Sequence, residues 1–246
     1  MPLVLASRRL PPLVNIMDIT NPQFWLSVAQ IIVIDILLGG DNAVVIALAC
    51  RQLPEHLRKK GIAWGVVGAV GLRIVLIFFA LQLLGLPFLK VVGALLLLWI
   101  GIKLMVPEED DPHEKIKGHD HLWGAVRTIV IADAVMSIDN VIAVAGAAKG
   151  ELSLVVFGIA VSIPIIVFGS QFVLKLMDKF PIVITLGAGL LGWIAGDMIV
   201  SDVFVKPYLV STPHWFHFLT AGLGAIIVIA VGTYLVKRQE GRAHAV

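Results

Sequence analysis

The sequence predicts an all-α polytopic membrane protein with seven transmembrane helices, arranged as two inverted three-helix repeats followed by a C-terminal seventh helix. The first observation behind this prediction is composition: 59% of the 246 residues are hydrophobic and 15% are charged, whereas soluble domains contain about 45–50% apolar and about 25% charged residues. The second is a series of seven apolar windows, each near the length of about 20 residues that spans a bilayer. The third is an internal repeat that places aspartates inside two of these windows.

The windows follow a short N-terminal lead-in, in which prolines and Asp18 interrupt any apolar run of the kind that a signal peptide needs. They cover roughly residues 24–50, 62–84, 88–105, 122–148, 153–176, 182–200 and 216–236. The chain therefore divides into the lead-in (1–23), a first three-helix repeat (24–105), an acidic, histidine-bearing cytoplasmic loop (106–121), a second, inverted three-helix repeat (122–200), and a seventh helix with a basic tail (201–246).

Charge and cysteine usage limit the partners of the chain. The net charge of +2 and the scattered basic residues argue against a nucleic-acid partner. A single cysteine, Cys50, excludes an intrachain disulfide framework and any multi-cysteine zinc site. Twelve lysines and arginines fall in connections on one side of the predicted bilayer and five on the other. The positive-inside rule then places the N-terminus outside and the C-terminus in the cytoplasm.

The internal repeat pairs "IIVIDILLGGDNAVVIA" (31–47) with "IVIADAVMSIDNVIAVA" (129–145). Asp35, Asp41 and Asn42 align with Asp133, Asp139 and Asn140 at one constant offset, and "VGALLLLWIGIKLM" (92–105) aligns with "LGAGLLGWIAGDMI" (186–199). Because each repeat holds three helices, an odd number, the two copies must cross the bilayer in opposite senses. Inverted repeats of this kind are typical of transporters whose site lies near the midplane, where the halves meet.

The aspartates of the repeat need compensation within the bilayer. A charged residue at the centre of a spanning helix costs about 2.5–3.5 kcal/mol, so four ionised, central aspartates would cost roughly 10–14 kcal/mol. Protons, basic partners or a bound cation could supply that compensation. The structural alternative is a set of hydrogen-bonded polar groups that join helices, but two copies of D-x5-D-N in register favour a functional site.

The spacing of the motif raises a question about the backbone. Six residues turn an ideal helix through about 600°, which points Asp35 and Asp41 about 120° apart. Gly39 and Gly40 lie between them, and glycine weakens a helix by about 1 kcal/mol relative to alanine. A break or wide turn there would bring both carboxylates toward one point and free backbone carbonyls as ligands. The second copy has Ser137 nearby, either as an oxygen ligand or bonded back to its own helix.

The donor set favours a hard divalent cation. Carboxylate, amide, hydroxyl and carbonyl oxygens suit Mg²⁺, Ca²⁺ and Mn²⁺. Arg73, midway along the second window, is a functional candidate by position, either neutralising an aspartate or gating the path. Asp197 is a candidate for the mouth of the pathway or for an interfacial carboxylate. The acidic segment 107–121 is read as a solvated linker, or else as a loose collector or sensor of metal ions.

The paired segments "DILLGGDN" and "DAVMSIDN" in a seven-span chain resemble the TerC family of bacterial integral membrane proteins, in its short, single-domain branch. The resemblance implies a protein of the bacterial inner membrane that is associated with manganese efflux, metal homeostasis and tellurite resistance. It implies that the metal-binding positions are Asp35, Asp41, Asn42, Asp133, Asp139 and Asn140. Mn²⁺ is then the expected transported ion, with no prosthetic group and no enzymatic activity, and exchange with protons is compatible with the excess of carboxylates.

Three other functions stay open at the level of sequence. The chain could export another cargo, such as an amino acid or another cation, since the resemblance extends to a superfamily with amino-acid exporters. It could be a membrane scaffold for complexes of the metal or tellurite stress response. An intramembrane aspartic protease would also need two apposed carboxylates, but it would leave the duplicated aspartate and the following asparagine unexplained.

Overall fold

The computed structural model of this chain describes residues 22–84, 86–107, 118–147, 152–209, 212–213 and 215–243. Over these residues the fold is entirely helical, without a β-strand. The α-helices are α1 (Pro22–Arg51), α2 (Glu55–Leu84), α3 (Leu89–Met105), α4 (Gly118–Ala147), α5 (Leu152–Lys179), α6 (Ile182–Val200) and α7 (Trp215–Ala243), with a short 3₁₀ turn, η1 (Lys206–Leu209), before α7.

Two helices begin earlier than their apolar windows predict. α2 begins at Glu55 rather than near residue 62, and α4 begins at Gly118 rather than at residue 122. Hydropathy marks the part of a helix that can lie in lipid, whereas the helix itself continues through polar residues beyond it, as "EHLRKKG" does at the start of α2. The end of the predicted loop 106–121 is therefore helical. The lead-in up to residue 21 and residues 108–117 lie outside the described residues.

The predicted break at Gly39 and Gly40 is wrong, because α1 is one continuous helix of 30 residues that passes through both glycines. The physical reason is the solvent: in lipid, a broken turn leaves backbone groups without partners at a cost of several kcal/mol each. That cost exceeds the intrinsic penalty of about 1 kcal/mol for a glycine in a helix. α4 is equally continuous through its own copy of the motif.

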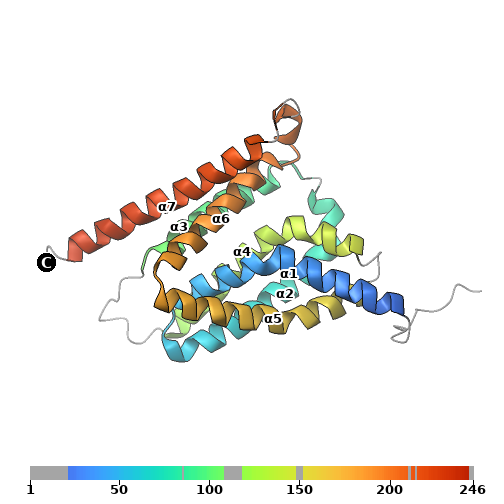
Figure 1. Cartoon of the computed structure of the whole chain (residues 1–246), viewed down its shortest axis with the longest axis horizontal. Helices are drawn as coiled ribbons and strands as arrows, with labels where there is room; N and C mark the ends of the chain where they lie inside the picture. Colours follow the sequence, from blue (N-terminus) through green and yellow to red (C-terminus); the bar gives the residue numbers. More distant parts are fainter. Residues whose placement is uncertain are drawn as a thin grey trace, which may run out of the picture.

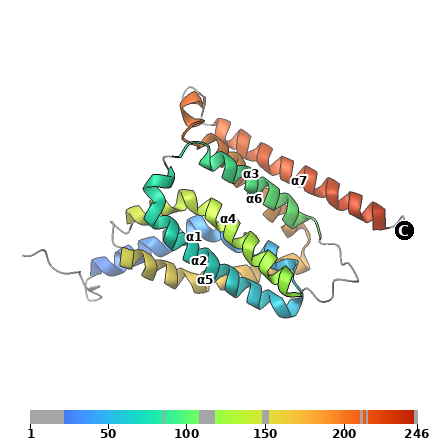
Figure 2. The same ribbon diagram turned by 180° about the vertical axis from the view of Figure 1, so that it is seen from behind.

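The helices form two groups. α1, α2, α4 and α5 form a bundle, in which α1 packs mainly against α5 and α2 mainly against α4, while α1 and α4 also touch. α3, α6 and α7 lie together as a separate layer along one side of this bundle (Figure 1), and the opposite view has the same arrangement (Figure 2). The main buried cluster of apolar residues draws on α1, α2, α3, α4, α5 and α6, so it joins the layer to the bundle.

The outer surfaces of the helices are those of a membrane protein. Five candidate membrane spans lie within the described residues: Glu55–Phe79, His121–Ile138, Val156–Lys179, Ile182–Val200 and Trp215–Gly241. Large apolar side chains stand exposed on these helices, such as Phe168 at 70% and Phe218 at 66% of full exposure. In water such surfaces would aggregate, whereas lipid tails are as apolar as the side chains themselves. The chain is therefore an integral, multi-pass membrane protein.

Polar contacts tie the helix ends together on each side. On one side, the Gln52 amide after α1 donates to the carbonyls of Lys103 and Val106 at the end of α3, at 3.4 and 3.2 Å. On the same side, Arg58 at the start of α2 pairs with Asp178 at the end of α5 at 2.8 Å. The end of α1, the start of α2 and the ends of α3 and α5 therefore share one side of the molecule.

On the other side, Asp202 follows α6 and caps the start of α3. Its completely buried carboxylate accepts the backbone N–H groups of Phe88 at 3.1 Å and Lys90 at 3.0 Å, and also that of Phe204 at 2.8 Å. Phe88 has a left-handed backbone with φ 63, which costs about 1–2 kcal/mol for a residue with a side chain. The Asp202 hydrogen bonds and the Phe88–Phe204 ring contact, with centroids 4.2 Å apart, offset that cost.

The backbones of α6 and α7 approach each other at glycines. A Cβ atom placed on Gly192 would lie 2.8 Å from the Cα of Ala225, and one placed on Gly196 would lie 2.7 Å from the Cα of Ala221. No real Cβ fits there, so these positions require glycine. Small residues that let backbones touch are the usual means of packing helices within a bilayer. α7 is thereby fixed closely against α6.

Candidate functional site

The candidate site lies where α1, α4 and α2 meet. α1 carries Asp41 and Asn42, α4 carries Asp133, Ser137 and Asn140, and α2 carries Arg73. α4 packs against both α1 and α2, so these three helices lie together. Asp35, Gly39 and Asp139 lie within helical backbone, but their side chains lie outside the described residues.

Arg73, Asp133 and Ser137 form a hydrogen-bonded triad within the bundle. The Arg73 guanidinium donates from Nη2 to Oδ1 of Asp133 at 2.5 Å and from Nε to the Ser137 hydroxyl at 3.1 Å. Ser137 in turn donates to Oδ2 of Asp133, also at 3.1 Å. Both carboxylate oxygens of Asp133 are therefore engaged, one by a charged donor and one by a hydroxyl.

The triad is almost sealed from its surroundings. Arg73 is 4% exposed, Asp133 is 5% exposed and Ser137 is fully buried. At low dielectric, an unpaired charge in this position would cost several kcal/mol, which a partner of opposite charge with satisfied hydrogen bonds offsets. The structure pairs Arg73 with Asp133, one of the aspartates of the repeat. Ser137 bonds to two side chains, that of Arg73 on α2 and that of Asp133 one turn earlier on its own helix.

The α1 part of the site differs from the α4 part. Asp41 accepts the backbone N–H of Asn42 at 2.9 Å, and its carboxylate interacts electrostatically with Asp133 and Arg73. Asn42 is 3% exposed, and neither its amide nitrogen nor its amide oxygen has a hydrogen-bond partner within the described part of the chain. Such an orphaned amide costs about 1–3 kcal/mol, and buried groups of this kind require an explanation.

The remaining predicted residues take other positions. Gly40 is exposed, and a Cβ placed on it would meet nothing within 4 Å. Asn140 is half-buried and takes part in an interaction of its own. Asp197 does not join the site, because it is exposed on α6 and contacts Nδ1 of His217 on α7 at 3.2 Å. The structure therefore brings together Asp41 and Asp133 with Arg73 and Ser137, and leaves Asp197 at the surface.

Among the described side chains, no three of the types His, Cys, Asp or Glu gather closely enough to hold a metal ion. The described donors are instead two aspartates, a hydroxyl and an orphaned amide, with a guanidinium already paired to one carboxylate. All of these donors are oxygens or an amide, which hard divalent cations prefer. The described cluster therefore combines oxygen donors with one positive side chain that already neutralises a carboxylate.

Sequence reasoning missed Asp202 and the buried guanidinium nitrogen of Arg51. Asp202 belongs to no motif, and the sequence marks it only as an isolated acidic residue directly after an apolar helix. Its capping role appears only when α6 ends beside the start of α3. Arg51 was counted as a positive-inside residue, yet its Nη1 is buried without a hydrogen-bond partner in the described structure.

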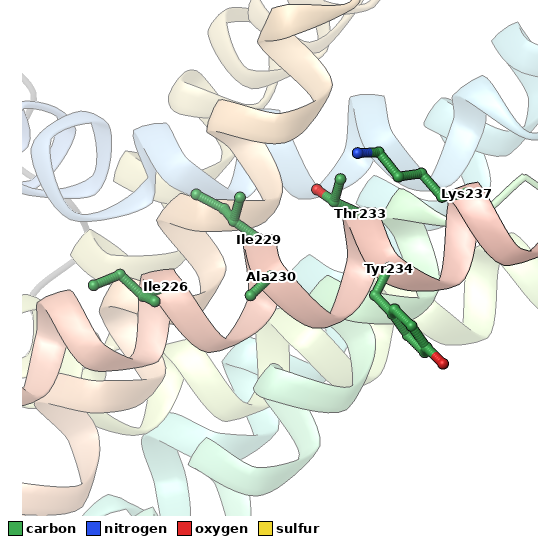
Figure 3. Close-up of a pocket in the computed structure, with 6 residues that line it drawn as sticks. All are labelled: Ile226, Ile229, Ala230, Thr233, Tyr234 and Lys237. Carbon is green, nitrogen blue, oxygen red and sulfur yellow. The ribbon is translucent and has the colours of Figure 1, made fainter.

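A groove on α7 is separate from the polar cluster. It is lined by Ile226, Ile229, Ala230, Thr233, Tyr234 and Lys237 (Figure 3), all of them on one helix. Its walls are mostly apolar and it opens widely to the exterior, as expected for the lipid-facing side of a spanning helix. It holds none of the aspartates of the repeat.

The sequence matches a known family over nearly its whole length. The model of the family described as "Integral membrane protein TerC family" matches residues 20–240. An uncharacterized membrane protein of Bacillus subtilis, YjbE, is 48% identical over 179 residues, which are 73% of this chain and 81% of that protein. A second Bacillus subtilis membrane protein, YceF, is 27% identical over 91% of this chain and 88% of its own length.

A more distant relative is longer. The UPF0053 inner membrane protein YoaE of Escherichia coli K12 is 25% identical over 89% of this chain, which covers 44% of that protein. The shared part of YoaE is thus less than half of its length. No solved structure matches this chain.

Proposed function

Since this chain belongs to the TerC family of integral membrane proteins, we propose that it is a transporter that exports divalent metal ions, with Mn²⁺ as the cargo. The proposed metal ligands are Asp35, Asp41, Asn42, Asp133, Asp139 and Asn140, with Ser137 and Arg73 as accessory groups. The chain acts in transport and not in catalysis, and it needs no prosthetic group.

One observation carries the proposal: a buried polar cluster with an unpartnered amide lies at the meeting of α1 and α4. Asn42 is buried with both amide atoms unsatisfied, and the Asp41 carboxylate beside it is held by the Asn42 N–H. A cation bound there would satisfy the amide oxygen and offset the burial of the carboxylate. Polar groups that cost stability and lie inside a membrane bundle are the usual mark of a transport pathway.

The helix packing supports the proposed architecture of two inverted three-helix repeats plus a seventh helix. If α1 corresponds to α4 and α2 to α5, then the contact between α1 and α5 should recur between α4 and α2. These two contacts are the most extensive within the bundle. α3 and α6, the third helices of the repeats, also pack against each other. The site would then lie on the pseudo-symmetry axis, as in transporters of this kind.

The proposed orientation has the N-terminus outside and the C-terminus in the cytoplasm of a bacterial inner membrane. The contacts of Gln52 and Arg58 gather the ends of α1, α3 and α5 on one side of the molecule. That side holds Arg51, Arg58, Lys103 and Lys179, in keeping with the positive-inside rule. Metal would enter from this side and leave at the side of Asp202.

The test is Mn²⁺ uptake into inverted membrane vesicles, in which an exporter moves its cargo inward. The wild-type chain should accumulate Mn²⁺, whereas Asp41→Asn and Asp139→Asn should each lose most of the uptake. Asp178→Asn, a carboxylate at the end of α5 outside the site, is the matched control and should transport normally. Undiminished uptake in both site variants would overturn the assignment of the site.

The alternative is that the chain exports a different cargo, which competition experiments in the same uptake assay can test. An amino-acid substrate would need a positive group for its carboxylate, but Arg73 is already paired with Asp133, which favours a cationic cargo. Competition by amino acids, Ca²⁺ or Mg²⁺ against Mn²⁺ uptake identifies the preferred substrate. A scaffold for metal or tellurite stress complexes would retain its partners after loss of the aspartates and would move no metal.

A further inference from the structure

We propose that Arg73 is a tethered counter-cation of the transport cycle: its guanidinium occupies Asp133 when the site is empty and gives way when a divalent cation binds. This inference rests on the proposed function, metal export through the D-x5-D-N segments. It goes beyond that function by naming the group that neutralises the empty carrier.

The first step is geometric. Asp133 has both oxygens engaged, Oδ1 by Arg73 and Oδ2 by Ser137. Ser137 also accepts a hydrogen bond from Nε of Arg73, so the guanidinium fits the carboxylate and the hydroxyl together. A cation that coordinates Oδ1 of Asp133 would share this oxygen with the guanidinium, which lies 2.5 Å from it.

The second step is electrostatic. A divalent ion on Asp133 would stand within a few ångströms of the guanidinium, in an interior where the dielectric screens charge poorly. Arg73 and Asp133 are both at least nine-tenths buried, so water cannot weaken the repulsion. The two cations are therefore competitors for one carboxylate, and binding of one lowers the affinity of the site for the other. Such reciprocity follows from linkage.

The third step concerns the return of the empty carrier. After release of the metal, a carboxylate at the centre of the bundle would remain charged and unpaired, which is costly in a membrane interior. Arg73 lies on α2, which packs against the helix that carries Asp133. Its side chain therefore supplies positive charge at once, without an ion from solution. The carrier can then reorient with Asp133 neutralised.

This assignment separates two kinds of flux. Net export requires the empty carrier to return, whereas exchange of Mn²⁺ for Mn²⁺ requires only the loaded carrier. Loss of Arg73 should therefore impair net export more than exchange. Loss of a residue that only holds the fold together would impair both by the same factor.

The experiment uses the full-length protein in proteoliposomes with radioactive Mn²⁺. Arg73→Gln is expected to lower the ratio of net export to exchange about tenfold or more. It should also tighten Mn²⁺ binding by a similar factor, within the range of known couplings between competing ligands. Arg73→Lys keeps the positive charge but lacks the planar guanidinium. Its ratio of net export to exchange should lie between those of the wild type and Arg73→Gln. The control is Arg58→Gln, on the same helix as Arg73, which breaks the surface pair between Arg58 and Asp178 of α5. It should not change the ratio of exchange to net export.

The outcomes are distinguishable. Equal loss of exchange and net export in a folded Arg73→Gln protein, or no change in either, overturns the role of Arg73. If Arg73→Gln does not fold, Arg73→Lys is tested in its place. An unchanged ratio of exchange to net export, together with unchanged Mn²⁺ affinity, would then overturn the role of Arg73. If the wild-type protein shows neither flux with Mn²⁺, the proposed function fails, independently of Arg73.

Discussion

The carboxylate of Asp202 accepts the backbone N–H of Phe88 across 114 positions in the sequence, at 3.1 Å. The same carboxylate accepts the N–H of Lys90 at 3.0 Å, so one buried side chain satisfies the first turn of α3. Phe88 offers no side-chain cap of its own. The connection after α6 therefore completes a helix of the first half of the chain.

Replacing Asp202 by alanine should destabilise the protein. The change leaves three backbone N–H groups without their acceptor, at an expected cost of about 1–3 kcal/mol. Thermal unfolding in detergent measures the effect as a lower midpoint. Glu240→Ala, at an exposed position near the end of α7, should leave the midpoint unchanged. An equal midpoint for Asp202→Ala and wild type would contradict the capping role.

The contribution of Asp202 should depend on pH. Burial raises the pKa of its carboxyl, but the hydrogen bonds from the backbone N–H groups of Phe204, Phe88 and Lys90 outweigh burial and hold the pKa below its usual value. A carboxyl with a lowered pKa in the folded state stabilises the protein above its unfolded pKa of about 3.9. That stabilisation is lost as the pH falls through the folded value. The difference in unfolding midpoint between wild type and Asp202→Ala should therefore be constant near neutral pH and shrink below about pH 4.

Replacing Ser137 by alanine should lower Mn²⁺ export more than it lowers stability. The change removes the hydroxyl that donates to Asp133 and accepts the N–H of Arg73. Because polar contacts inside membrane bundles contribute about 0.6 kcal/mol on average, and up to about 1.7 kcal/mol, the loss of stability should be small. Export and the unfolding midpoint should be measured on one preparation. Ser170→Ala is the matched control, since Ser170 is also fully buried but donates only to the carbonyl of Val167 on its own helix. A larger loss of export in Ser170→Ala would argue against the triad.

Replacing Asn42 by alanine should separate function from stability. Its amide is buried and unsatisfied, so its removal should leave the unfolding midpoint unchanged or raise it. Export should fall about tenfold or more, the usual scale for losing a partner of a metal site. Gln52→Ala is the control with the opposite expected outcome. The Gln52 side-chain amide lies outside the site and donates to the Val106 carbonyl at the end of α3. The variant should lower the midpoint and spare export.

Replacing Gly196 by alanine should separate α6 from α7. The new Cβ would lie 2.7 Å from the Cα of Ala221, and overpacking of this kind costs about 1–3 kcal/mol. Gly71→Ala is the control, since a Cβ on Gly71 meets nothing within 4 Å and alanine favours the helix by about 0.5–1 kcal/mol. The midpoint should therefore fall in the first variant and rise slightly in the second. Equal midpoints would mean that the two helices can move apart freely.

The sequence allowed the helices to be predicted well, because lipid imposes a simple rule on their length and apolar content. The starts of α2 and α4 were placed too late, since helical hydrogen bonding does not stop where hydropathy falls. The break at Gly39 and Gly40 was wrong for a related reason: propensity measured in water underestimates how strongly a bilayer enforces a continuous helix.

The residues of the described polar cluster could be singled out from the sequence, but their pairing could not. The aspartates and Arg73 stand out from the apolar background by residue type alone. That Arg73 pairs with Asp133, 60 residues away, depends on α2 packing against α4, which no local pattern encodes. The same holds for Asp202 and for the contact of Asp197 with His217.

The glycine contact between α6 and α7 has a consequence for where the folding unit of this chain ends. α7 follows the two repeated segments and could be taken for an appendage. Yet a chain cut after residue 200 would lose the backbone contacts that α7 makes at Gly192 and Gly196. We therefore expect the unit that folds to include α7, because α6 makes its most extensive helix contact with it.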